Sequence, residues 1–204
     1  MTEEQLHDTK LKIINSAREL FALKGFEGAS VREIASSAGV NIAALNYHFS
    51  SKQNLFLHII DLGYSETSKA IEDYIASHPD ESVEEFSVWT FRYFLEKSNM
   101  LRSVFKMMLS DMSMDEKHLP QEDFGPPGSR AFATAIVKEL NLPITEAEMF
   151  WAVKMIFSSI VHFALMYSNR FCSLDGKEHP YHTQAALEKD IRRLVKVVLK
   201  DLRQ

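Results

Sequence analysis

The sequence predicts an all-α protein. Glycine and proline, which interrupt helices most strongly, are scarce, with 7 and 6 among 204 residues. Apolar residues recur three and four positions apart along most of the chain, which is the periodicity of a helix with one buried face. Serine or threonine stands three residues before glutamate at the start of several apolar segments, a signature of helix N-termini. Together these signals predict about nine helices.

The first helix is expected to end at Lys24. Ile13, Ala17 and Phe21 mark its buried face. Gly25 follows directly, and glycine is the residue that most often stands just past the end of a helix.

A second, short helix and a tight turn follow. Ser30 and Glu33 form a capping box at the start of this helix. Gly39 suits the turn, because a residue without a Cβ adopts left-handed backbone conformations at low cost. Asn41 is expected to cap a further helix, whose Leu45 packs against the first two. This order of elements is typical of a helix-turn-helix.

The later helices follow from the same signals. Ser51, Ser82 and Thr145 are expected N-cap residues of three of them. We therefore expect a domain boundary after residue 51, with domains at 1–51 and 52–204. The predicted helices lie at 52–75, 83–97, 100–111, 130–140, 146–170 and 183–202.

The composition is that of an ordinary soluble protein, with 46% hydrophobic and 25% charged residues. The net charge of −5 does not indicate nucleic-acid binding by the whole chain, so any DNA site must be local. Cys172 is the single cysteine, which excludes an internal disulfide framework and favours a reducing cytoplasm. Neither a signal peptide nor an apolar run near the ~18 residues of a membrane span is visible. We predict a cytoplasmic protein without a membrane segment.

The N-terminal segment contains, in this order, Ala17, Leu20, Phe21, Gly25, Phe26, Ser30, Val31, Ile34, Ala35, Ala38, Gly39, Val40, Leu45, Tyr47, His48, Phe49, Lys52 and Leu55. With these residues it resembles the DNA-binding module of the TetR family of bacterial repressors. The family pattern is A-x-x-L-F-x-x-x-G-F/Y, then S/T-V/I-x-x-I-A, A-G-V, L-Y-x-H-F and K-x-x-L. Asn46 departs from it, since the family most often has Tyr directly after the Leu, and the chain reads Asn-Tyr-His-Phe. The remaining, longer part of the chain agrees with the family in helical character and length.

The resemblance implies a three-helix helix-turn-helix DNA-binding domain followed by a helical ligand-binding and dimerisation domain. It implies phosphate contacts for Ser30, Tyr47, His48 and Lys52. The side chains that it places at base edges are those of Asn41, Ala43, Ala44 and Asn46. The residues taken singly have other interpretations: His48 as a packed neutral histidine, and Lys52 as a solvated surface lysine.

The charge of this segment is balanced. Residues 1–52 hold six basic and six acidic side chains, so their net charge is zero. Few phosphate contacts per subunit predict a shallow salt dependence of DNA binding. They also make a homodimer necessary, because two modules roughly double the contacts.

Aromatic and methionine side chains are dense in the C-terminal domain. Most are expected in a packed core, but such side chains also adapt to varied ligands. We predict an apolar pocket for a small effector lined by Trp89, Tyr93, Phe105, Met108, Met155 and His162.

The last two helices carry apolar faces that, by the resemblance, pair with those of a second subunit in a four-helix bundle. The alternative is that one such face packs inside its own subunit. The predicted interface residues are Ile156, Ile160, Phe163, Tyr167, Ile191, Leu194 and Val198.

These features predict a repressor that binds a palindromic double-stranded DNA operator as a homodimer and is released by a small, hydrophobic effector. A helix-turn-helix activator or architectural DNA binder without ligand release is the alternative. An enzyme is not expected, because the sequence has no glycine-rich phosphate loop, nucleophile elbow or HExxH motif. Glu178, His179 and His182 are interpreted as loop residues rather than as a metal site. We expect no cofactor and no catalytic residue.

Overall fold

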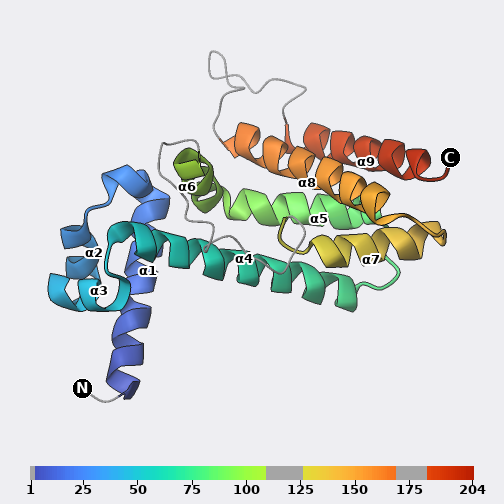
Figure 1. Ribbon diagram of the computed structural model, residues 1–204. Coiled ribbons are helices and arrows are strands. Elements are labelled where there is room, and N and C mark those ends of the chain that lie inside the picture. The colour runs from blue at the N-terminus through green and yellow to red at the C-terminus, as the bar shows by residue number, and fades with distance from the viewer. Residues whose placement is uncertain (1–2, 109–125, 169–182) are drawn as a thin grey trace, which may run out of the picture. The chain divides into compact units, whose positions relative to one another are not determined.

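The computed structural model of the protein describes residues 3–108, 126–168 and 183–204 (Figure 1). In these ranges the chain forms helices and no strand, which confirms the predicted all-α class. The helices are α1 (Glu3–Gly28), α2 (Val31–Ser37), α3 (Ile42–Phe49), α4 (Lys52–Ser77), α5 (Val83–Glu96), α6 (Ser98–Met108), α7 (Ser129–Leu140), α8 (Glu146–Ser168) and α9 (Gln184–Asp201).

The chain divides into two compact units, and α4 contributes to both. Leu55, Phe56 and Ile59 of α4 are fully buried in the core of the first unit. The structural division therefore differs from the predicted boundary after residue 51. The first unit comprises residues up to 63 and the described residues from 99 to 108; the second comprises 64–98, 126–168 and 183–204.

Aromatic rings form the centre of the first unit. Phe21 and Phe56 are fully buried and meet edge to face, with ring centroids 4.9 Å apart. Phe26 lies 5.1 Å from Phe56 in a similar arrangement. Met100 and Val104 of α6 pack against the same core. Burial of each such ring contributes about 2–3 kcal/mol, so this cluster holds α1 and α4 together.

Gly25 bends α1. Its φ of 73° and ψ of 173° interrupt the helix, although a helical turn continues to Gly28. Residues with a Cβ rarely adopt such a positive φ. The predicted end at Lys24 is therefore a kink, after which the chain carries Phe26 toward the core.

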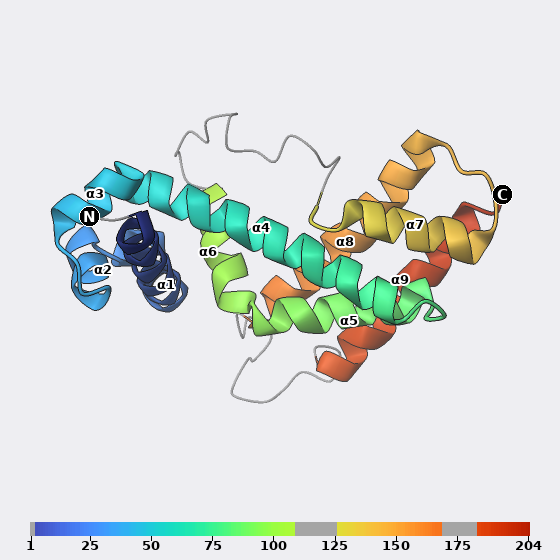
Figure 2. The same cartoon turned by 90° about the horizontal axis from the view of Figure 1, so that it is seen from below.

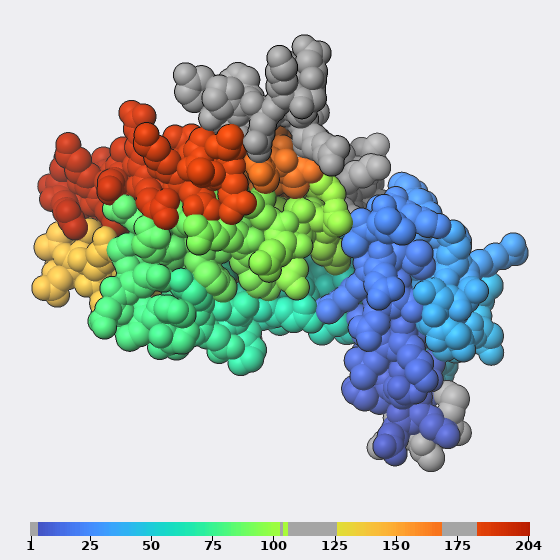
Figure 3. Space-filling view, turned by 180° about the vertical axis from the view of Figure 1, so that it is seen from behind, coloured from blue at the N-terminus to red at the C-terminus, as the bar shows by residue number. Residues whose placement is uncertain are grey.

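α5 lies at the centre of the second unit, where it packs against α7, α8 and α9 (Figure 1). The α9 helix forms one surface of this unit (Figure 3). The later part of α4 is joined to the start of α7, because the Gly128 amide donates to the Ser68 hydroxyl at 3.1 Å (Figure 2). The second unit is thus a layered helical bundle.

α8 is long and apolar enough to cross a membrane, judged by length and composition. No such segment was predicted from the sequence. Ile156, Ile160 and Ala164 on one face of this helix are fully buried, and α8 packs against α5, α7 and α9. Core helices of soluble proteins have the same composition, so this burial favours a core helix.

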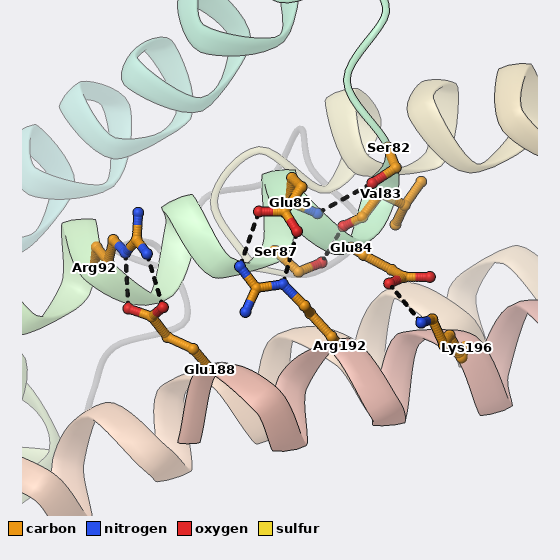
Figure 4. A network of polar contacts seen from close by, with 9 residues as sticks. All are labelled: Ser82, Val83, Glu84, Glu85, Ser87, Arg92, Glu188, Arg192 and Lys196. Atoms are coloured by element: carbon orange, nitrogen blue, oxygen red, sulfur yellow. Dashed lines mark hydrogen bonds and ion pairs between the residues drawn. The ribbon is translucent and has the colours of Figure 1, made fainter. Parts of the chain in front are cut away.

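Ion pairs fix α9 against α5. Both guanidinium donors of Arg92, Nε and Nη2, reach the Glu188 carboxylate, at 2.8 and 2.7 Å. Glu188 is only 8% exposed, and these hydrogen bonds are the main reason why its pKa lies below the ordinary value. The three pairs are Arg92–Glu188, Glu85–Arg192 and Glu84–Lys196 (Figure 4).

We expect Arg92→Met to lower the free energy of unfolding of the second unit by about 2 kcal/mol, because Glu188 is left buried without its charged partner. Urea unfolding monitored by circular dichroism measures the loss. Arg193→Met, at an exposed position of α9, is the control. The pKa of Glu188 is depressed in the folded protein. The loss in free energy of unfolding is therefore complete above pH 4.5 and becomes smaller as the pH falls below it. Equal stabilities of the two variants at pH 7 would contradict this role.

Candidate nucleic-acid interface

The α2–turn–α3 segment has helix-turn-helix geometry. The Val40 amide donates to the Ala35 carbonyl at 2.9 Å, and the Gly39 amide donates to that of Ser36 at 3.1 Å. Gly39 has a φ of 66°, a conformation in which glycine lacks the steric cost of other residues. The turn between the two helices is therefore tight and hydrogen-bonded.

Two predicted DNA-contact residues cap these helices. The Ser30 hydroxyl accepts from the Glu33 amide at 3.2 Å, and the Glu33 carboxylate accepts from the Ser30 amide at 3.0 Å, which confirms the capping box. The Asn41 Oδ1 accepts from the Ala44 amide at 2.8 Å. These bonds satisfy amides at the helix starts, so both side chains have a structural role before any ligand arrives.

The α3 helix separates buried from exposed side chains. Leu45 and Phe49 point into the core of the first unit, with 0% and 6% exposure. Ala43 and Asn46 are exposed, and Tyr47 is 72% exposed. A large aromatic side chain that remains outside the core is available to a partner. The exposed face of α3 therefore presents Ala43, Asn46 and Tyr47 together, whereas Ala44 is half-buried.

His48 lies at the flank of α3 rather than on its most exposed face. It is half-buried, and its ring meets those of Tyr47 and Phe49 with centroids 5.2 and 6.2 Å away. Its Nε2 is buried and has no hydrogen-bond partner among the described residues. Buried polar atoms usually have a partner, so this nitrogen has an unused hydrogen-bonding capacity.

Lys52 joins the start of α4 to the end of α1. Its ammonium group donates to the carbonyls of Phe26 at 2.9 Å and Ala29 at 3.2 Å, and it lies 4.2 Å from the centroid of the Phe26 ring. These bonds span 23 and 26 residues of sequence. Lys52 is thus not a freely solvated lysine, because it links the corner between α1 and α2 to α4.

We expect Lys52→Met to destabilise the first unit by about 2 kcal/mol, because two carbonyls lose a charged donor while the side-chain stem is retained. Amide hydrogen exchange of Leu45 and Phe56 reports on the stability of this unit. Lys24→Met removes a cation from an exposed ion pair and serves as the control, with little change expected. Unchanged exchange in Lys52→Met would instead favour a role confined to DNA phosphates.

An exposed ion pair lowers the basic character of the module. Lys24 Nζ lies 2.6 Å from the Glu33 carboxylate. Hydrogen bonds, first from Lys24 and then from Ser30, hold the pKa of Glu33 at about 2. Glu33 is therefore ionised at neutral pH, and Lys24 is partly neutralised.

A hollow of about 400 Å³ lies beside α3 within the first unit. It was not expected from the sequence, because its residues come from three helices and share no local motif. Its polar lining consists of Lys10 from α1, His48 and Ser50 at the end of α3, and Asn54, His58 and Asp61 from α4.

The N-terminal module matches a known protein family. Residues 13–59 match the family described as bacterial regulatory proteins, tetR family. The N-terminal module is of the tetR type. "Probable HTH-type transcriptional regulator YttP" of Bacillus subtilis is 46% identical over 77 residues, which are 38% of this chain and 37% of that protein. "HTH-type transcriptional regulator AcrR" of Shigella flexneri is 33% identical over 78 residues, 38% of this chain and 36% of that protein. The chain thus aligns with little more than a third of each relative.

Solved structures extend the likeness in fold beyond the tetR-type module. A tetR-family transcriptional regulator from Streptomyces coelicolor has a TM-score of 0.66 at 17% identity, and the match covers 98% of this chain and 85% of that one. NalD of Pseudomonas aeruginosa, the secondary repressor of a multidrug efflux pump, has a TM-score of 0.54 at 17% identity over 98% of both chains. At this identity the likeness concerns the fold, in which a helix-turn-helix is followed by a helical domain.

The predicted effector-pocket residues are dispersed over the described part of the chain. Trp89 and Tyr93 of α5 stack with ring centroids 5.5 Å apart. Met155 and His162 are exposed on α8. Phe105 belongs to the first unit, and the side chain of Met108 lies outside the described residues. The structure therefore does not bring the predicted set together.

The predicted dimer residues divide into two groups. Ile156, Ile160, Ile191 and Val198 are at most 2% exposed, because these side chains pack inside their own subunit. Their assignment to an interface is therefore corrected to the core. Half-buried positions remain for Phe163, Tyr167 and Leu194.

Proposed function

We propose that the protein is a tetR-type transcriptional repressor that binds a palindromic DNA operator as a homodimer and is released by a small, hydrophobic effector. The observation that carries the proposal is the exposed face of α3, positioned by a capped and buried helix-turn-helix. The names of matched proteins support the direction of regulation, since AcnR of Corynebacterium diphtheriae and NalD are both called repressors. We place this activity in the cytoplasm, without a cofactor.

The side chains of α3 suit different contacts with DNA. The exposed Asn46 amide has the donor and acceptor that pair with adenine in the major groove. Ala43 and Ala44 are small enough to admit a thymine methyl group. The Tyr47 hydroxyl, on a stiff exposed side chain, suits a phosphate oxygen.

An exposed apolar stripe on α8 supports dimerisation. Trp151 and Met155 are each 39% exposed, although both are large and apolar. Two exposed polar residues, Ser158 and His162, follow on the same side of α8 at spacings of three and four. Val197 of α9 is 61% exposed. We assign this stripe, rather than the buried face, to the contact with a second subunit.

The α4 helix provides a route from effector to DNA, because one helix contributes to both units. An effector that prefers a displaced α4 would change the spacing of the two recognition helices in a dimer. Two half-sites one helical turn apart require a spacing of about 34–36 Å. An error of a few ångströms would remove one module from its groove.

Operator selection tests the proposal. The purified full chain is mixed with random duplexes at low salt, and bound sequences are identified for wild type, Asn46→Ala and Tyr47→Phe. We expect a palindromic consensus, with relaxed preference at one position in Asn46→Ala and weaker binding of unchanged sequence preference in Tyr47→Phe. Absence of enrichment by a folded dimer would reject DNA reading. Operator binding that no hydrophobic effector weakens would favour the activator or architectural alternative.

A further inference from the structure

The hollow beside α3 is a cluster of hydrogen-bond donors. Lys10 Nζ lies 5.9 Å from the centroid of the Phe49 ring, which places the ammonium group at the rim of the recognition helix. Ser50 and Asn54 supply a hydroxyl and an amide. His48 contributes an imidazole whose Nε2 has no partner among the described residues.

The electrostatics of the hollow favour an anion. His58 lines it, and burial, followed by the charge of Lys10, lowers the pKa of His58; Arg18 acts in the same direction and Asp61 in the opposite one. Among the charged neighbours Lys10 has the largest effect on this ring, so its ammonium charge acts at the hollow, which the Asp61 carboxylate also lines. An anion would be attracted by the charge of Lys10 and would accept hydrogen bonds from the ammonium group and the imidazoles.

We propose that this hollow binds a phosphate group of the operator backbone, through Lys10 together with His48 and His58. The inference rests on the proposed function and adds residues of α1 and α4 to the interface. The hollow adjoins the end of α3, whose exposed face carries the base-reading residues, so a backbone that flanks the groove passes close to it. A phosphate here would also help a module of zero net charge to hold DNA.

The salt dependence of operator binding tests this assignment. Lys10→Gln removes the charge but keeps much of the stem beside Phe49. Lys12→Gln is the matched control, because Lys12 lies on the same helix and pairs with Asp8 at 2.6 Å on an exposed surface. Affinity for the selected operator is measured with the full chain over a series of KCl concentrations.

In Lys10→Gln we expect the slope of log affinity against log salt to fall by about 0.9 per subunit, or about 1.8 for a dimer. Lys12→Gln should keep the wild-type slope. Equal slopes in the two variants would overturn the proposal. Circular dichroism melting curves verify that both variants are folded.

Inorganic phosphate distinguishes the two sources of the anion. Ring proton signals of His48 and His58 are followed by NMR while phosphate is added to the DNA-free protein, in wild type and in Lys10→Gln. Shifts in wild type that disappear in the variant, together with the altered slope, support a phosphate site used by DNA. The same shifts with an unaltered slope would assign the hollow to a soluble anion and overturn the operator contact. If wild type binds no duplex, the proposed function fails, whereas these shifts still report on the anion site separately.

Discussion

Met155→Glu is expected to convert the protein to a monomer in solution and to lower its affinity for a palindromic operator by about 100-fold or more. Met155 lies in the middle of the exposed stripe of α8, so a second copy would bury the new carboxylate against apolar side chains. Loss of the dimer removes the gain from two linked modules, which is on the order of 10²- to 10⁴-fold. Analytical ultracentrifugation and operator titration measure the two effects.

Val137→Glu is the matched control for this change. Val137 is 43% exposed on α7, so the substitution adds the same charge at a similar exposure on another helix. It should leave both the mass and the affinity unchanged. A Met155→Glu protein that remains dimeric would place the subunit contact elsewhere.

Phe56→Ala should lower the free energy of unfolding of the first unit by about 3–5 kcal/mol, because it opens a cavity between the rings of Phe21 and Phe26. The buried amides of α3 should then exchange faster, and operator binding should weaken at temperatures where the unit is partly unfolded. Hydrogen exchange of the full chain measures the two units separately, and the amides of the second unit should keep their protection. Leu23→Ala, at a position 78% exposed, should leave exchange unchanged.

Local signals accounted for much of the fold. The capping box of Ser30 and Glu33 and the cap at Asn41 follow from residues three positions apart, so the sequence defines their partners directly. The Ser51 cap is confirmed in the same way, because its hydroxyl accepts from the Asn54 amide at 3.0 Å. Such interactions depend on the helix itself and hardly on the tertiary arrangement.

Long-range contacts could not be predicted in this way. Lys52 has a sequence context suited to phosphate binding, yet its partners are carbonyls more than twenty residues away. Arg92 meets Glu188 across 96 residues. Nothing in the local pattern distinguishes such a pair from two solvated charges, because the choice depends on how the helices pack.

Helical periodicity also left the interface face of α8 undetermined. Ile156 and Ile160 are apolar and lie on one face, and so are Trp151 and Met155 on the other. A pattern of this kind predicts burial of both faces without indicating what covers each of them. Which of them contacts a helix of the same subunit becomes apparent when α5 and α9 are in place.

The two units alternate along the sequence, so neither can be exchanged between proteins at a single position without changing the other. Leu55, Phe56 and Ile59, encoded after the helix-turn-helix, complete its core, and Met100 and Val104 return to that core after residues 64–98 have entered the other unit. Replacing the chain after residue 51 would bring eight foreign side chains into the core of the first unit, because Leu57, Ile60 and Leu62 also pack there. Exchange of the second unit between proteins of this fold therefore requires two junctions, or a donor whose α4 and α6 side chains fit the α1 core of the recipient.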